Sequence, residues 1–280
     1  MTALFSLAMA SMAFVQHQPS LKMHIPSTRT GAPCCLLPPL VAALAADVAA
    51  GGLAAVGCAP LVACTDQAIT LNANGGAKLW PTLIDKMKGV VRKPVAFFSS
   101  AAFVWLWFVY FMTYAVANAT ATLSRACGVS PTIPVLVCST IANMGTCVAK
   151  DAAFARMLSR QGEDKPVPVQ SYVAWFGRDI ITMGFVFTLP TLLAARVPDL
   201  VCRFAAPLVA QYFTTPLHLL GLAYYNLPAA SPLSAKLASV SRTLGPTVFA
   251  RQFRILPAFS LGGVANTRIK AALLQRALGA

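Results

Sequence analysis

The chain has 280 residues, of which 57% are hydrophobic and only 11% are charged, whereas a soluble domain carries about 25% charged residues. So few charges cannot cover a soluble surface, and the composition therefore excludes a water-soluble globular enzyme, a disordered chain and a coiled coil. The class that remains is an all-α membrane protein with several transmembrane helices.

Basic residues outnumber acidic residues by 22 to 8, which gives a formal net charge of +14. The first interpretation is the usual enrichment of lysine and arginine in loops, which makes membrane lipid, and anionic lipid at the basic loops, an expected partner. The second is a positively lined cavity for a small anionic solute. No basic cluster interleaves with aromatic side chains in a polar domain, so no nucleic acid is expected as a partner.

Residues 1–38 have the composition of a targeting leader. No Asp or Glu precedes Asp47, whereas Lys22 and Arg29 occur among scattered serines and threonines. Such a leader is typical of an organellar transit segment, and it predicts the mitochondrial inner membrane, with a plastid or other organellar membrane as the alternative. The apolar residues 3–15 also fit a secretory signal, although no Lys or Arg precedes them.

Six windows of about 20 residues are apolar enough for transmembrane helices. They cover residues 39–64, 95–123, 131–155, 172–195, 199–224 and 245–267. Long and short connections alternate, which predicts a membrane domain over 39–272 built from three two-helix repeats, at about 39–123, 131–195 and 199–267, with a tail at 273–280. The long connections, such as 65–94, are the more basic and are expected on the matrix or cytoplasmic face.

Ionisable residues inside these windows are candidates for function, because a charge within a membrane is costly. The candidates are Arg178, Asp179, Arg251 and Arg254 for substrate binding, and Lys150, Asp151 and His218 for a gate. Arg251 and Arg254 are three residues apart and share a helix face, where two guanidiniums can hold a carboxylate or a phosphate. The alternative is that these groups form structural ion pairs and that His218 is a hydrogen-bonded histidine inside the bundle.

Proline also interrupts the windows, and Pro60, Pro216 and Pro257 are the expected kinks beside the gate, since each removes one backbone hydrogen bond. No Cys or His spacing suits a metal ion, so neither a metal nor another cofactor is expected. No nucleophilic, metal-binding or phosphate-loop constellation is present, so no catalytic residue is expected either.

The three repeats resemble the mitochondrial carrier family over about residues 39–272. That family has Pro-x-Asp/Glu-x-x-Lys/Arg in its odd helices and Arg-x-x-Arg-x-x-Pro in its last even helix. Similar segments are Pro216-Leu217-His218-Leu219-Leu220-Gly221 for the first motif, Arg251-Gln252-Phe253-Arg254-Ile255-Leu256-Pro257 for the second, Ala149-Lys150-Asp151 and Arg178-Asp179 in the middle repeat, and Pro60-Leu61 in the first. The resemblance implies a carrier-like bundle that translocates a small anionic metabolite by alternating access.

The sequence also departs from the carrier pattern. Where the carrier motif has its three acids, this chain has Val62, Asp151 and His218. Where the motif has its three basic residues, this chain has Thr65, Phe154 and Gly221. No salt-bridge gate of the carrier kind is therefore expected. The missing gate favours a second interpretation, a structural or accessory subunit or scaffold of a membrane complex. Segments such as KDAAFARML and RILPAFSLGGVANTR are similar, nearly end to end, to an uncharacterised multi-span family of fungi, plants and algae, which implies no activity.

Overall fold

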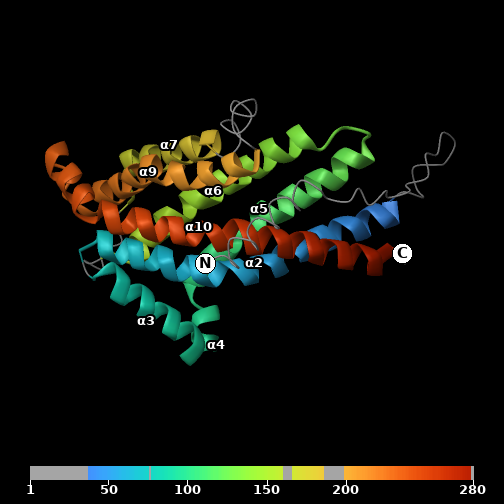
Figure 1. Cartoon of the computed structure of the whole chain (residues 1–280), viewed down its shortest axis with the longest axis horizontal. Helices are drawn as coiled ribbons and strands as arrows, with labels where there is room; N and C mark the ends of the chain where they lie inside the picture. The colour runs from blue at the N-terminus through green and yellow to red at the C-terminus, as the bar shows by residue number, and fades with distance from the viewer. Residues whose placement is uncertain (1–36, 76, 160–165, 186–198, 279–280) are drawn as a thin grey trace. The chain divides into compact units, whose positions relative to one another are not determined.

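The computed structural model describes residues 37–75, 77–159, 166–185 and 199–278, so the predicted leader lies almost entirely outside the described residues. Within these ranges every regular element is a helix (Figure 1). The helices are α2 (Leu37–Ala73), α3 (Leu79–Arg92), α4 (Pro94–Phe98), α5 (Ala101–Ala126), α6 (Thr132–Met157), α7 (Val169–Met183), α9 (Asp199–Asn226) and α10 (Leu233–Leu278). The prediction of an all-α chain is confirmed for the described residues.

Three of the described helices are long and apolar enough to cross a membrane. They are α2 from Pro39 to Ala73, α5 and α6. A helix of 26 residues, the length of α5 and of α6, is about 39 Å long, which exceeds the roughly 30 Å of bilayer hydrocarbon. The windows at 199–224 and 245–267 fall within α9 and α10, which are not among these candidates, and the window at 172–195 ends outside the described residues. Six spans in three repeats therefore remain a prediction.

The connection predicted over residues 65–94 is mostly helical, and this prediction was wrong. Helix α2 continues to Ala73, and α3 occupies most of the remainder. Thr65, Asp66 and Gln67 directly follow the predicted window and are polar, yet all three side chains are buried. Because these polar side chains are buried inside the protein, helix α2 continues past the position where hydropathy alone predicts its end.

The window predicted over 95–123 is divided by a pair of serines. Helix α4 ends at Phe98 and α5 begins at Ala101. The Ser99 hydroxyl donates to the Val95 carbonyl at 2.8 Å, and the Ser100 hydroxyl donates to the Phe97 carbonyl at 2.7 Å. Hydroxyls that bond nearby backbone carbonyls compete with helical pairing, which explains the break at this point.

The described helices belong to two compact units. Unit 1 takes its residues from 1–59, 107–143 and 259–280, and unit 2 takes its residues from 60–106 and 144–258. Helices α2, α5, α6 and α10 each contribute residues to both units, whereas α3, α4, α7 and α9 belong to unit 2.

Unit 1 is held together by a buried ion pair between α2 and α10. The Lys270 Nζ atom lies 2.7 Å from Asp47 Oδ1, and Asp47 has no exposed surface. Thr122 of α5 donates a hydrogen bond to the other carboxylate oxygen, and the Asn118 amide donates to Asn266 Oδ1 at 2.8 Å. Burial lowers the pKa of the Lys270 ammonium, and the neighbouring Asp47 carboxylate opposes that shift. These contacts connect α2, α5 and α10 through polar groups.

Close backbone contact between α2 and α5 accompanies this ion pair. A Cβ atom placed on Gly51 would lie 2.8 Å from the backbone nitrogen of Ala115, so only glycine fits. The Trp107 Nε1 atom donates to the Gly52 carbonyl at 3.0 Å. Small residues that let helix backbones approach are typical of helix contacts within membranes.

The Lys270→Met substitution is expected to destabilise the protein by about 3–5 kcal/mol, because it leaves the Asp47 carboxylate buried without its cation. Thermal unfolding of the detergent-purified protein measures the loss. Arg268→Met is the matched control, since Arg268 is exposed on the same helix and its removal should change stability by about 0.5 kcal/mol or less. Equal midpoints for the two variants would contradict a structural role for the ion pair.

Candidate substrate site

The site in unit 2 is framed by the packing of α7 against α9, which run side by side (Figure 1). Trp175 of α7 is fully buried, and its Nε1 atom donates to the His218 carbonyl at 3.2 Å. The Ser171 hydroxyl donates to the Gly221 carbonyl at 2.7 Å. A side chain on Gly221 would collide with the Trp175 indole, so this glycine is required for the two helices to meet. The contact fixes Arg178, one turn beyond Trp175, against His218.

Six charged side chains from four helices form one connected group, which we call the ion-pair network. Its members are Asp66 of α2, Lys150 and Asp151 of α6, Arg178 and Asp179 of α7, and Arg254 of α10.

Each neighbouring pair in the network is in direct contact. Lys150 Nζ lies 2.6 Å from Asp66 Oδ2 and 2.6 Å from Asp151 Oδ1. The Arg178 guanidinium pairs with Asp151 through Nη1 and, at 2.7 Å, with Asp179 Oδ1 through Nη2. Arg254 Nη1 pairs with the second oxygen of Asp66. Three carboxylates therefore face three cations, and their formal charges cancel, as buried charges require.

The members of the network differ in their access to solvent. The Arg254 side chain is 19% exposed, compared with 6% for its partner Asp66, and Lys150, Asp151 and Arg178 are buried. Arg254 is therefore the member of the network whose exposed fraction exceeds that of its partner.

His218 closes the network on the side of α9. Its Nδ1 atom lies 2.9 Å from Arg178 Nη1 and 3.8 Å from Asp151 Oδ2. A guanidinium can only donate, so Nδ1 accepts this hydrogen bond and the ring carries its proton on Nε2. The histidine in this arrangement is neutral and leaves the charge balance of the network unchanged.

Arg251 adds a further positive charge close to this balanced group. Arg251 is 3% exposed, and its Nε atom donates to Gln211 Oε1 at 2.9 Å. The Gln211 amide nitrogen donates in turn to the Pro207 carbonyl at 3.1 Å, which fixes the oxygen toward the guanidinium. Within the part of the chain that the structure describes, no carboxylate lies within ion-pair distance of Arg251. A buried cation of this kind is suited to binding an anionic group of a ligand.

Buried hydroxyls continue the polar surface beside Arg251. Thr214 and Thr215 lie between Gln211 and His218 on α9, at the spacing that puts all four side chains on one helix face. Thr247 lies one turn before Arg251 on α10. The three threonine hydroxyls, together with Asp179 Oδ2, are buried and have no hydrogen-bond partner among the described residues. Buried polar atoms are normally paired, so these four atoms are groups that can form hydrogen bonds with a polar solute.

The predicted site residues are distributed as follows. Five of them belong to the ion-pair network, namely Lys150, Asp151, Arg178, Asp179 and Arg254. His218 contacts the network through Arg178, whereas Arg251 binds Gln211. Pro60 and Pro216 each lie inside a continuous helix, α2 and α9. Helix α10 passes through position 257, but the Pro257 side chain lies outside the described residues.

The expectation that no salt-bridge gate of the carrier kind forms stays a prediction. An ion-pair network exists, but Asp66 is the acid of α2 in place of the expected motif position, Val62. Asp66 was missed because the predicted span ended at residue 64. Gln211, Thr214 and Thr215 were also missed, although their spacing to His218 was readable as one polar helix face.

Donor groups for a metal ion are not assembled in the described ranges, where no cluster of three or more His, Cys, Asp or Glu side chains is positioned to hold one. The site brings fixed charges, amides and hydroxyls together in unit 2.

Asp151→Asn is expected to destabilise unit 2 by about 3–5 kcal/mol, because Lys150 and Arg178 both lose a buried partner charge. Asp85→Asn provides the control, since Asp85 is exposed on α3. Thermal unfolding in detergent compares the two variants. If Asp151→Asn unfolded at the wild-type temperature, the network would not contribute to stability.

Comparison with known families adds a functional class. A family model described as a probable citrulline exporter matches residues 50–274. No curated protein matches the chain, and the resemblance to mitochondrial carriers receives no support from the family that is found. This is a family of membrane transporters of a small metabolite and not of enzymes. The matched residues include every member of the ion-pair network. Because the match extends over most of the chain, the protein belongs to the family of probable citrulline exporters.

Proposed function

We propose that the protein translocates a small zwitterionic amino acid of the citrulline kind across an organellar membrane, without covalent chemistry. The observation that carries the proposal is Arg251, a buried guanidinium outside a network whose own charges already cancel. The family description supports the same class of solute.

Arg251 is the proposed ligand of the solute carboxylate. A guanidinium remains charged when it is desolvated, and it presents a planar fork of donors that fits a carboxylate in bidentate fashion. Gln211 binds the Nε donor, and no other partner of the guanidinium occurs among the residues that the structure describes, so its remaining nitrogens can face the solute. Gln211 holds the fork in one orientation and thereby lowers the ordering cost of binding.

The amino and side-chain ends of citrulline also find complementary groups in the site. The solute ammonium needs a carboxylate, and Asp179 Oδ2 is a buried acceptor without a described partner. The ureido group is neutral and both donates and accepts hydrogen bonds, which suits the hydroxyls of Thr214, Thr215 and Thr247. A zwitterion adds no net charge to the buried site, but both of its charged groups must be paired when they leave water, and Arg251 and Asp179 offer the two opposite charges.

The Asp66–Arg254 pair is the proposed gate. Its guanidinium is the most exposed member of the network, and a solute carboxylate competes with Asp66 for it. Alternating access requires such contacts to form and break as the solute passes. Lys150 and Asp151, which were expected to form a gate, hold Asp66 and Arg178 in place on the buried side.

A simple anionic metabolite is the second substrate class, and the extra positive charge of Arg251 favours it. We place the protein in the mitochondrial inner membrane on the composition of residues 1–38, with a plastid membrane as the alternative. The structural or accessory-subunit hypothesis is favoured by the full pairing of Asp66 and Asp151, and it predicts a stable complex with no solute flux.

Uptake by proteoliposomes that contain the purified full chain tests the proposal. Radiolabelled citrulline is offered against internal citrulline, and competition is measured with ornithine, a dicarboxylate and inorganic phosphate. Arg251→Ala is expected to lower uptake about 10- to 100-fold, the value of a hydrogen-bonded charge pair of about 1.5–3 kcal/mol.

Arg242→Ala is the control for the uptake experiment, because Arg242 is exposed on the same helix and should transport as the wild type does. Uptake of a labelled dicarboxylate or of labelled phosphate, with no uptake of citrulline, would assign the site to the anionic class. Unchanged citrulline uptake by a correctly folded Arg251→Ala protein would contradict the proposed role of Arg251. No uptake of any solute by the wild type would favour the subunit hypothesis.

A further inference from the structure

Helix α3 has two apolar faces, and only one of them is covered. Leu79 and Leu83 are buried: Leu83 packs with Cys64 and Ala68 of α2, and Leu79 packs with Ile69 of α2 and Ala250 of α10. This face anchors α3 to the rest of unit 2.

The second apolar face of α3 is exposed. Trp80, Ile84, Met87 and Val91 follow one another at intervals of four, three and four residues, which is one continuous strip on a helix. Ile84 is 51% exposed and Val91 is 84% exposed, and Val95 of α4 prolongs the apolar surface with 82% exposure. Trp80, at the start of the strip, makes an edge-to-face contact with Phe249 of α10, with ring centroids 5.6 Å apart, and the exposed surface extends from Ile84 onward.

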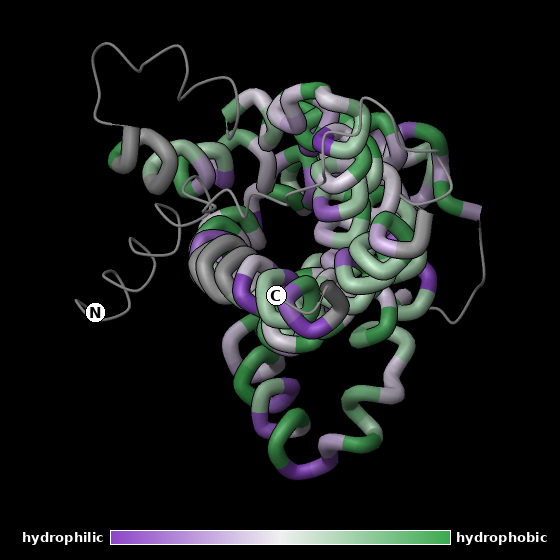
Figure 2. Tube along the Cα trace, turned by 90° about the vertical axis from the view of Figure 1, so that its right-hand side faces the viewer, coloured by the Kyte–Doolittle hydropathy of each residue, from purple (hydrophilic) through white to green (hydrophobic). Residues whose placement is uncertain are grey.

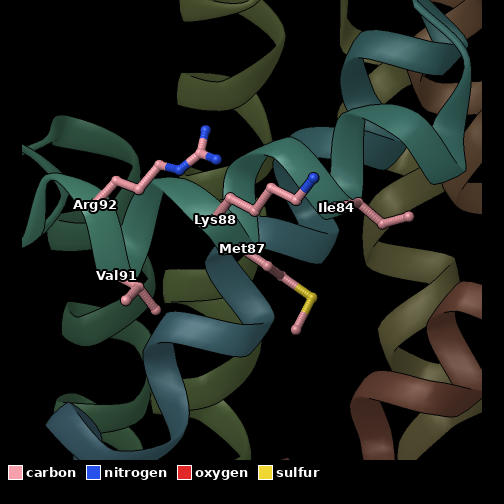
Figure 3. Close-up of a pocket in the computed structure, with 5 residues that line it drawn as sticks. All are labelled: Ile84, Met87, Lys88, Val91 and Arg92. Carbon is pink, nitrogen blue, oxygen red and sulfur yellow. The ribbon is translucent and has the colours of Figure 1, made fainter.

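Positive charges border this exposed strip. Ile84, Met87 and Val91 line a shallow depression together with Lys88 and Arg92. Figure 3 shows the long side chains of Lys88 and Arg92 extending from one side of the helix and those of Met87 and Val91 from the other. Residues 78–93 contain five lysines and arginines against a single acid, Asp85. Figure 2 shows the same alternation of hydrophilic and hydrophobic positions along α3, the lowest helix in that view.

Chain connectivity places α3 next to the membrane. The candidate span in α2 ends at Ala73, six residues before α3 begins, and the candidate span in α5 begins at Ala101, three residues after α4 ends. With 14 residues, α3 is about 21 Å long, too short and too charged to cross the hydrocarbon itself. A short amphipathic helix between two spans is held at the boundary between lipid and water.

We propose that α3 and the start of α4 form a binding surface for a bilayer that contains anionic phospholipid. The strip of Trp80, Ile84, Met87 and Val91 enters the boundary of the acyl chains, and Lys88 and Arg92 extend to the lipid phosphates. Long cationic side chains commonly cover apolar surface with their stems while their heads reach the headgroup layer. The excess of positive charge selects anionic over zwitterionic lipid.

The test compares the full-length protein in vesicles of phosphatidylcholine alone with vesicles in which about a third of the lipid is phosphatidylglycerol. Backbone hydrogen exchange over residues 79–98 is measured in both. We expect slower exchange in the anionic vesicles, and in Lys88→Gln/Arg92→Gln we expect that difference to fall by about fivefold for each cation removed.

Two controls separate lipid binding from other causes of protection. Arg242→Gln/Arg268→Gln removes two exposed cations from α10 and should leave the difference between the two lipids intact. Ile84→Ser/Val91→Ser should speed exchange in both lipids, since it removes the apolar contact. The proposal is overturned if exchange over 79–98 is the same in both lipids. It is also overturned if the strip is protected only in native membranes, where a protein partner would be the occupant.

Discussion

Lys150 lies between two buried carboxylates, and the organisation of unit 2 depends on this contact. The ammonium is 2.6 Å from Asp66 of α2 and 2.6 Å from its neighbour Asp151 on α6. An ion buried in a helical bundle must be paired, because its desolvation costs several kcal/mol. Asp66 then engages Arg254 of α10, and Asp151 engages Arg178 of α7, so the positions of four helices are linked through one lysine.

The two units use buried charge in different ways. In unit 1 the Asp47–Lys270 pair is surrounded by Thr122, Asn118 and Asn266, which hydrogen-bond to the pair or to one another. Unit 2 has a balanced network as well, but it also contains a buried arginine held only by an amide in the described structure, and four buried polar atoms without described partners. Unit 1 thus has the character of a structural contact, whereas unit 2 retains unused capacity for a polar ligand. Such capacity is expected of a solute site and not of a purely structural bundle.

The sequence predicted the class of the fold and much of the site, and its main error at the site, the omission of Asp66, has a physical cause. Hydropathy and the rule that charges inside spans are functional candidates found Arg178, Asp179, Lys150, Asp151 and Arg254, which the structure brings together. Hydropathy also ended the predicted first span before Asp66. A local average of hydropathy does not include the partners of a polar side chain, and those of Asp66 are Lys150 and Arg254, which lie 84 and 188 positions further along the chain. Partner choice, such as Gln211 for Arg251, is set by tertiary packing.

The central claim is that the charged surface of unit 2 binds a zwitterionic solute. The most direct measurement is thermal unfolding of the purified protein with citrulline, a dicarboxylate or inorganic phosphate, for the wild type and for Arg251→Ala side by side. At 100 times its dissociation constant a ligand adds about 2.7 kcal/mol to the native state. The account predicts an upward shift with citrulline that disappears in Arg251→Ala. A shift of equal size in both proteins, or no shift with any of the three solutes, would contradict it.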